Sequence, residues 1–553
     1  MRRYRKPTLA GIVILSVFSF FAFNSPSDRY FEIAKNLDIF ATLYKEVNTY
    51  YVDEVNPNML IKKGIDAMLE SLDPYTNYIP EDEVEDFRTM TTGQYGGIGA
   101  VIGKRDEKPL ILMPYEGFPA HKAGLKVGDE LIEVDGVNVK DKSTSEISKL
   151  LKGQSNTKVK VVVNRFGEEA PIEMSITREK VKIDAVPYYG LVDEHVGYIQ
   201  LSDFTSGASK DIKKAVGQLK EEGATSIILD VRDNPGGLLS EAVNISNIFI
   251  PKDSEVVRTK GKNAKWNKVY SALSHPVDTD IPVVVLTSGR SASASEIVAG
   301  VIQDYDRGIL VGQRTFGKGL VQATRPLTYN SQLKVTTAKY YTPSGRCIQA
   351  IDYSNRKDDG SVGKIPDSLR VAFKTKGGRK VFDGGGVTPD IEVDKKPLGP
   401  ITASLISKGL LFDYATVYAA KNKEIKPAKE FQLSDKEYKE FIEWLEKTDK
   451  DYDYTTKVEN TLSELINTAK KEQYYDAIKD QIYSLRDQVT HNKDNDLKNF
   501  QDEIKEHLEQ EIVSRYYLQK GVIEASFDSD EEILAAIKIL KDSSEYNKLL
   551  KGE

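Results

Sequence analysis

Residues 283–322 read VVVLTSGRSASASEIVAGVIQDYDRGILVGQRTFGKGLVQ. The apolar run 283–286, ended by Thr-Ser-Gly-Arg, predicts a buried strand that stops at a turn. A helical pattern follows at once and begins within residues 291–296. A hydroxyl at a helix start lies beside unpaired backbone N–H groups and the positive end of the helix dipole. Acyl-transfer enzymes direct such groups at a developing oxyanion.

The serines at this helix start have two interpretations. Ser293 and Glu296 fit a capping box, in which the serine caps the helix and the glutamate reaches back. The catalytic interpretation is favoured by Lys318, which lies between Gly317 and Gly319 in an apolar setting. A lysine kept out of water has a lowered pKa and can act as a general base, whereas a lysine on a surface turn cannot.

Histidine is scarce in the chain, which has five, and none lies within residues 291–322. Residues that are distant in sequence can still meet in space, so a serine–histidine–aspartate triad is not excluded. The sequence nevertheless favours a serine–lysine pair.

The order of these motifs resembles that of the carboxy-terminal processing proteases, a family of tail-specific serine proteases. The similarity rests on residues 291–297, Gln-Asp-Tyr at 303–305, and the run GQRTFGKG at 312–319, followed by glutamine. The resemblance implies that Ser293 is the nucleophile, Lys318 the general base and Gln322 the residue that orients the lysine. Ser291 and Ser295 are the neighbours most easily confused with the nucleophile.

A second turn, Asp-Asn-Pro-Gly-Gly at 233–237, follows the apolar run 227–231. Strands that alternate with helices predict a parallel sheet, in which ligand sites gather at the carboxyl ends of the strands. The resemblance implies an oxyanion hole made by Ala294 N–H and by either Gly236 or Gly237. We expect the sheet to continue through residues 309–312 and 333–341, and residues 352–384 to form an exposed insertion.

Residues 91–182 change to a period of two and are rich in glycine, which predicts a small β-barrel. The run AGLKVGDELIEVDG resembles a PDZ domain. Such a domain adds a chain end to its sheet as a strand and holds the terminal carboxylate with backbone N–H groups. Gly97, Ile98 and Gly99 are the candidates for that loop, although glycines there would also close a simple hairpin.

The flanks of the chain are helical in pattern. Residues 27–90 carry two amphipathic stripes, which are either packing elements or a surface for self-association. Residues 183–396 contain the protease core, and residues 397–553 form a helical accessory domain. We therefore expect a multidomain α+β protein, with a PDZ β-barrel ahead of an α/β crotonase/Clp-like core.

The first 26 residues predict export. Arg2, Arg3, Arg5 and Lys6 precede an apolar run at 9–23. Positive charges stay on the cytoplasmic side, so the remainder is expected in the periplasm or cell envelope. The sequence does not decide between a cleaved signal peptide and an anchor in the inner membrane.

Composition excludes several classes of function. The formal net charge of −7 offers no basic face for nucleic acid, and the single cysteine, Cys347, excludes an internal disulfide and a cysteine-based metal site. We expect no metal and no organic cofactor.

Together the patterns and the family resemblance indicate an exported serine endopeptidase, and the resemblance implies that it captures the C-terminal end of protein substrates through the PDZ domain. The alternative is a catalytically silent PDZ scaffold that binds peptide ends. A crotonase-type acyl-CoA enzyme is disfavoured, because no basic cluster for the adenine phosphates is found. An activating adaptor and self-association through the helical segments remain open.

Overall fold

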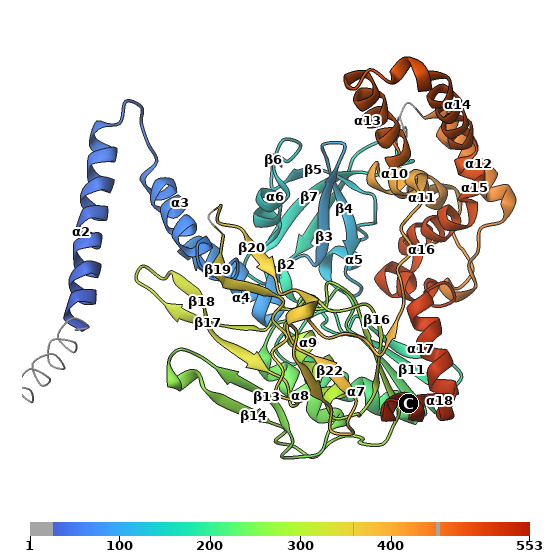
Figure 1. Cartoon of the computed structure of the whole chain (residues 1–553). Helices are drawn as coiled ribbons and strands as arrows, with labels where there is room; N and C mark the ends of the chain where they lie inside the picture. Colours follow the sequence, from blue (N-terminus) through green and yellow to red (C-terminus); the bar gives the residue numbers. More distant parts are fainter. Residues whose placement is uncertain (1–25, 358, 449–453) are drawn as a thin grey trace, which may run out of the picture. The chain divides into compact units, whose positions relative to one another are not determined.

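The computed structural model describes residues 26–357, 359–448 and 454–553 (Figure 1). The apolar run 9–23, on which the prediction of export rests, lies outside these residues. Among the residues described, no helix is both long enough and apolar enough to cross a membrane. The chain divides into two compact units, the first ending at Pro80 and including Thr324–Val335, the second comprising Glu81–Ala323 and Thr336–Glu553.

The first unit contains the two helices that the sequence predicts. These are α2 (Pro26–Tyr50) and α3 (Pro57–Glu70), followed by the short strand β1 (Asn77–Ile79). The side chain of Asn56 caps α3 by accepting a hydrogen bond from Met59 N–H. The apolar stripe of α2 is largely exposed, with Phe31 and Leu37 both about two-thirds accessible.

The PDZ region begins the second unit. Strand β2 (Gln94–Gly97) pairs with β9 (Glu179–Lys182), and the main sheet has the order β3-β4-β5-β7-β8, with β6 paired to β5. The helix α6 (Thr144–Leu151) starts with a capping box, and α5 (Pro119–Lys122) is a single turn. The strands of the main sheet are β3 (Ala100–Arg105), β4 (Lys108–Pro114), β5 (Glu130–Val134), β6 (Val137–Asn138), β7 (Lys158–Asn164) and β8 (Ile172–Thr177).

A six-stranded sheet with the order β10-β11-β12-β15-β16-β23 forms the core of the second unit. All neighbouring pairs are parallel except β10 with β11, which confirms the predicted crossover pattern. The strands are β10 (Tyr188–Asp193), β11 (Val196–Gln200), β12 (Ser226–Asp230), β15 (Val283–Thr287), β16 (Ile309–Gly312) and β23 (Ile391–Glu392).

Helices from two different parts of the chain pack on this sheet. The crossover helices α7 (Ala208–Glu221), α8 (Leu239–Phe249) and α9 (Ala294–Asp304) share one hydrophobic core with the strands. A second core joins the sheet to the end of α16 (Gln501–Ala525), to α17 (Glu531–Lys541) and to α18 (Ser543–Lys551). In that core Phe527 contacts the rings of Tyr188 and Tyr198. Helices α17 and α18 therefore complete the protease core.

The structure contradicts one expectation about the core. The run at 333–341 does not continue the parallel sheet: it forms β18 (Gln332–Tyr341), which pairs antiparallel with β13 (Glu255–Lys260) in a separate sheet. The burial of the two strands agrees with this difference. Strands of a parallel sheet are covered on both faces, and every residue of β16 is buried, whereas β18 is only partly buried.

The segment predicted as an exposed insertion contains two small antiparallel hairpins. They are formed by β19 (Ile351–Arg356) with β20 (Val362–Lys364), and by β21 (Ala372–Lys374) with β22 (Lys380–Phe382). Within this segment Arg379 is buried and bonds Asp306 at 2.6 Å and Asp390 at 2.7 Å. Part of the segment is therefore tied to the core.

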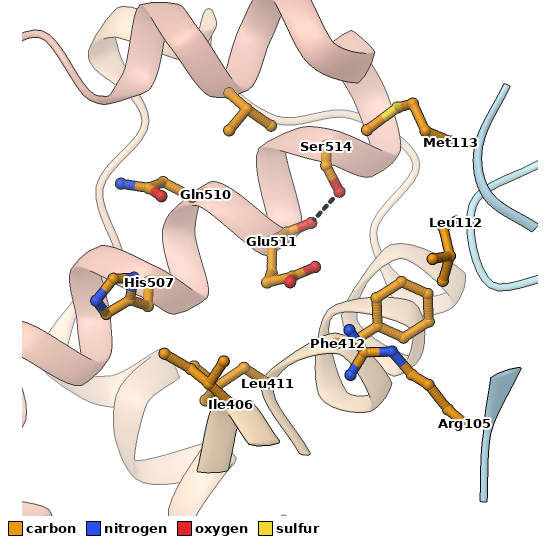
Figure 2. A pocket seen from close by; sticks show the side chains of 11 residues that line it. Arg105, Leu112, Met113, Ile406, Leu411, Phe412, His507, Gln510, Glu511 and Ser514 are labelled. Atoms are coloured by element: carbon orange, nitrogen blue, oxygen red, sulfur yellow. Dashed lines mark hydrogen bonds between the residues drawn. The ribbon is translucent and has the colours of Figure 1, made fainter. Parts of the chain in front are cut away.

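The C-terminal helical domain has a core of its own and also contacts the PDZ region. A cavity of about 320 Å³ lies at this contact. Figure 2 shows four of its lining side chains, Leu112 and Met113 from β4 and His507 and Ser514 from α16. None of the predicted catalytic residues lines it. The remaining helices are α10 (Pro400–Ser407), α11 (Leu410–Lys421), α12 (Asp435–Lys447), α13 (Lys457–Lys471), α14 (Tyr475–Asp494) and α15 (Asp496–Asn499).

The ring of Phe412 joins the two parts beside this cavity. The guanidinium carbon of Arg105, at the end of β3, lies 4.4 Å from the ring centre, and that of Arg515 lies 4.1 Å away. Phe412 is buried, and buried cation–π contacts are worth about 2 kcal/mol each. The contacts of Arg105 and Arg515 with the Phe412 ring hold the turn of the β3–β4 hairpin against the helical domain.

We predict that Phe412→Ala loosens this contact, at a cost of about 3–5 kcal/mol, as for other buried phenylalanines. Hydrogen exchange of the β3 and β4 amides should become faster, while exchange in β12 and β15 stays unchanged. Phe166→Ala is the control, because Phe166 is 55% exposed in the same PDZ region. Unchanged exchange in the β3–β4 hairpin of Phe412→Ala would contradict the role given to this ring.

Candidate active site

Ser293 occupies the turn between β15 and α9, as the sequence predicts. Its backbone has φ 56° and ψ −110°, a conformation that costs a non-glycine residue roughly 1–3 kcal/mol and that clusters at functional sites. The residue is half-buried, at the N-terminus of α9. The strained turn therefore holds one serine at the carboxyl end of a core strand.

The two neighbouring serines have structural partners. Ser291 and Ser295 are fully buried. The Ser291 hydroxyl donates to Val231 O at 2.7 Å, and the Ser295 hydroxyl donates to Asn234 O at 2.9 Å. Both hydroxyls tie the nucleophile turn to the turn after β12, which leaves Ser293 as the candidate of the three.

Glu296 lies at the centre of the site and is completely buried. Its Oε2 accepts the backbone N–H groups of Ser293 and Lys318, both at 2.8 Å. Its Oε1 accepts Gly317 N–H at 2.7 Å and the Thr315 hydroxyl at 2.6 Å. Two nitrogens that bond one oxygen at 2.8 Å are no farther apart than twice that distance. One carboxylate thus joins the serine turn to the lysine loop.

The electrostatics of Glu296 reflect two opposed effects. Burial raises the pKa of this carboxyl, and the hydrogen bonds from Thr315, Lys318, Gly317 and Ser293 act in the opposite direction. The four donors are arranged for the ionised form, since a carboxylate offers only acceptors.

Tyr340 on β18 is a second link between the serine and lysine segments. Its hydroxyl donates to Ser293 O at 3.1 Å, and its backbone N–H donates to Gly319 O at 2.9 Å. The ring is buried, which raises the pKa of the phenol well above its ordinary value. Tyr340 therefore remains a neutral hydrogen-bond donor.

Lys318 and Gln322 lie on the segment that leads into β17 (Leu320–Pro326). Both residues are half-buried. Gln322 Nε2 donates to the Thr336 hydroxyl at 3.1 Å, which fixes the amide against β18. Lys318 lies two residues before β17, and Gln322 is the third residue of that strand.

The turn after β12 packs directly on the nucleophile turn. Asn234 organises it: its Nδ2 donates to Leu201 O at 2.7 Å, and its Oδ1 accepts Gly236 N–H at 2.8 Å. A Cβ at Gly236 would lie 2.8 Å from Ala294 N, so only glycine allows this approach. Gly237 N–H and Ala294 N–H have no hydrogen-bond partner in the part of the chain that the structure describes.

The predicted carboxylate loop of the PDZ region is buried and tightly packed. Gly97 ends β2, while Ile98 and Gly99 connect it to β3. Gly99 has φ 76°, and a Cβ there would lie 2.6 Å from the Cβ of Phe118. Across the described residues, Ile98 N–H and Gly99 N–H have no hydrogen-bond partner.

Three residues of the site were not identified as such from the sequence. Glu296 was interpreted only as a helix cap, and Asn234 only as part of a turn. Tyr340 was assigned to a strand of the wrong sheet. A glutamate directly before the apolar run at 297–302 is a usable signal, since a buried charge needs partners.

The side chains that commonly bind metals do not gather into a site in the described residues. In residues 26–357, 359–448 and 454–553, no group of three or more His, Cys, Asp or Glu side chains is arranged to hold a metal ion. Cys347 is a free cysteine of intermediate exposure, and burial raises the pKa of its thiol.

Comparison with known proteins identifies three regions. Residues 195–355 match the model of peptidase family S41, residues 111–165 match that of a PDZ domain, and residues 401–540 match that of a probable PDZ-protease C-terminal helical domain. These regions agree with the architecture predicted from the sequence, which is thereby confirmed.

Individual relatives agree with these matches. A carboxy-terminal-processing protease of Bartonella bacilliformis is 35% identical over 59% of this chain and 75% of its own length. A probable CtpA-like serine protease of Staphylococcus aureus is 34% identical over 69% of this chain and 75% of its own. A solved photosystem II D1 C-terminal processing protease is 27% identical, covering 64% of this chain and 92% of that chain with a TM-score of 0.34. The chain therefore belongs to the carboxy-terminal-processing proteases of peptidase family S41, which are serine-type peptidases.

Proposed function

We propose that the chain is an endopeptidase that works through a serine–lysine dyad, Ser293 and Lys318, and cleaves proteins captured by their C-terminal ends. The observation that carries this proposal is the Glu296 carboxylate, which binds the backbone N–H groups of both residues. A single buried acceptor of this kind keeps the two turns in one fixed arrangement. Fixed placement of reacting groups is a large source of catalytic rate.

In the proposed mechanism, Ser293 Oγ attacks the carbonyl carbon of the peptide bond, and the neutral Lys318 amine takes the hydroxyl proton. The same amine then gives this proton to the leaving nitrogen, and an acyl-enzyme forms. Water, deprotonated by Lys318, hydrolyses the ester and restores the serine. Gln322 orients the lysine. No step requires a metal or an organic cofactor.

The oxyanion hole is proposed to consist of Gly237 N–H and Ala294 N–H. Both groups lack an internal partner among the described residues, whereas Gly236 N–H is occupied by the Asn234 side chain. Gly236 instead provides the close approach between the two turns. The sequence leaves the choice between Gly236 and Gly237 open, and the bond from Gly236 N–H to the Asn234 side chain supports the choice of Gly237.

The PDZ region is proposed to select the substrate. Strand β3 is at the edge of its sheet and pairs only with β4 within the described residues, so its other side can receive an extended peptide. The terminal carboxylate would accept the N–H groups of Ile98 and Gly99. Protein substrates with accessible C-terminal ends are therefore the expected partners.

We also propose that the chain is exported to the periplasm or cell envelope, on the basis of the basic residues and the apolar run at 9–23. Retention of that run would attach the protein to the membrane. An activating adaptor and self-association through the helical segments fit this location, and cell fractionation with an antibody to the core would test it.

Replacing either member of the dyad should abolish turnover. Ser293→Ala and Lys318→Ala are expected to lower kcat on casein by about 10⁴-fold or more, with unchanged circular dichroism. Lys364→Ala is the control, because Lys364 is an exposed lysine on β20. A fluorophosphonate should label Ser293 in the wild type, as read by mass spectrometry. Full activity of Lys318→Ala rules out the dyad, and an unlabelled, inactive wild type favours a silent scaffold.

The role of the Glu296 carboxylate can be separated from the general effect of removing a buried charge. In Glu296→Gln, one pair of donors would face an amide NH₂, which displaces either Ser293 and Lys318 or Thr315 and Gly317. A shift of about 1 Å lowers the rate by about 10²-fold. Glu241→Gln is the matched control, since the buried Glu241 accepts the N–H groups of Gly207 and Ser209, neither of which belongs to the serine turn or the lysine loop. Equal kcat values for the two variants would refute the assignment.

The PDZ proposal predicts that a free peptide carboxylate is required. A peptide with a free C-terminus should bind at least about tenfold more tightly than its amide, as expected for charge-assisted hydrogen bonds. Gly99→Ala should abolish the difference through its clash with Phe118. Gly136→Ala should retain it, because Gly136 also has a positive φ (78°) but a Cβ there would meet only one atom, 3.9 Å away. Equal affinity for acid and amide would contradict carboxylate recognition by this loop.

A further inference from the structure

A compact ionic cluster lies at the end of β12, outside the dyad itself. Arg232 binds Asp230 through two nitrogens, with Nε 2.9 Å and Nη2 2.6 Å from Oδ2. The same guanidinium contacts Asp530 at 2.8 Å and forms a close ion pair with Glu532. The side chains are mostly buried, between 2% exposed for Asp230 and 20% for Asp530. Three carboxylates therefore surround one arginine.

Two of these carboxylates come from the C-terminal helical domain. Asp530 is the N-cap of α17, where its side chain accepts the N–H groups of Glu532 and Ile533, both at 3.0 Å. Helix α17 packs against β12, β15 and β16, the three strands that lead to the oxyanion turn, the serine turn and the lysine loop. The acidic start of α17 is therefore fixed at the carboxyl edge of the sheet.

Arg232 is connected to the oxyanion turn through a short series of bonded residues. Its neighbour Asp233 has φ 57° and exchanges hydrogen bonds with Ser288, at 3.0 Å and 3.1 Å. The next residue, Asn234, accepts Ala292 N–H at 3.0 Å and binds Gly236 N–H through its side chain. The position of Arg232 thus decides where the 233–237 turn begins.

Glu532 also borders the strand that leads to the lysine loop. A Cβ at Gly312, the last residue of β16, would lie 3.2 Å from Glu532 Oε1. Glycine is required there by its φ of 118° and by Thr287 O, which would lie 2.3 Å from the added Cβ. Glu532 therefore pairs with Arg232 just after β12 and lies close to the end of β16.

We infer that Asp530 and Glu532 are positioning residues for the oxyanion turn, so that the C-terminal helical domain takes part in building the active site. The inference rests on the proposed function. The two carboxylates hold the guanidinium of Arg232, Arg232 fixes the start of the 233–237 turn, and that turn places Gly237 N–H. Neither carboxylate touches the substrate.

If the ion pairs of Arg232 with Asp530 and Glu532 only stabilised the fold, a different experimental result would be expected. Loss of such a pair lowers the folded fraction, whereas loss of a positioning residue lowers kcat in protein that remains folded. Oxyanion donors act only on the transition state, so KM should stay nearly constant. Comparing the change in kcat with the change in KM therefore distinguishes a positioning role from a stabilising role.

The test uses the full chain and the double variant Asp530→Asn, Glu532→Gln. Asparagine caps helices as well as aspartate does, so α17 keeps its start. Glu531→Gln is the matched control on the same turn, because Glu531 pairs with the exposed Lys396. Steady-state cleavage of a quenched fluorogenic peptide gives kcat and KM. The rate of Ser293 labelling by a fluorophosphonate provides a readout that does not depend on turnover.

The double variant is expected to lose about 10- to 100-fold in kcat, less than the roughly 10²- to 10³-fold cost of removing an oxyanion donor outright, and to keep KM within about twofold. Its labelling rate should fall in parallel, while Glu531→Gln matches the wild type. Wild-type values for the double variant would overturn the inference and leave the proposed function intact. If the wild type neither cleaves nor is labelled, the proposed function itself fails. If the double variant does not fold, the single variant Glu532→Gln is measured instead, and the same results support or contradict the inference.

Discussion

The arrangement of this site depends on one buried carboxylate that holds together two turns distant in sequence. Glu296 has no exposed surface and accepts four hydrogen bonds, three of them from backbone N–H groups. Burying a charge is costly unless every lone pair is used, so the surrounding backbone has little freedom to move. The serine turn and the lysine loop are therefore positioned by peptide groups, and the reactive side chains remain available for chemistry.

The parallel sheet supplies the other half of this arrangement. Strands β12, β15 and β16 are neighbours and run in the same direction, so their carboxyl ends meet at one edge. The turns that follow them carry the glycine pair, Ser293 and Lys318. Strain at Ser293 and the absence of a side chain at Gly236 allow the first two turns to pack in contact. The sheet brings the turns together, and Glu296 and Asn234 determine their final spacing.

Much of this architecture is readable from local patterns. The strand before Ser293, the helix after it and the crossover order follow from apolar runs and turn residues, and the long motif match identifies the dyad candidates. The resemblance favours Ser293 among the three serines, but local patterns do not show what Ser291 and Ser295 do instead, because their acceptors lie 60 and 61 residues away. The sequence does not show the role of Glu296 either, because a glutamate that only caps a helix and one that joins two turns have the same local sequence. Strand β18 was assigned to the wrong sheet because an apolar run does not identify its partner strand.

The use of α17 and α18 to cover the catalytic sheet has a consequence for biosynthesis. Strands β12, β15 and β16 present Ile228, Leu286 and Val311 to a core that also needs Ile533 and Tyr546. While these two helices are still within the ribosome, this apolar surface lacks their cover, and Arg232 lacks two of its three acidic partners. The nascent chain thus completes its protease core only after α17 and α18 have emerged. The last helices of the chain are thus required before the catalytic sheet can be covered on this face.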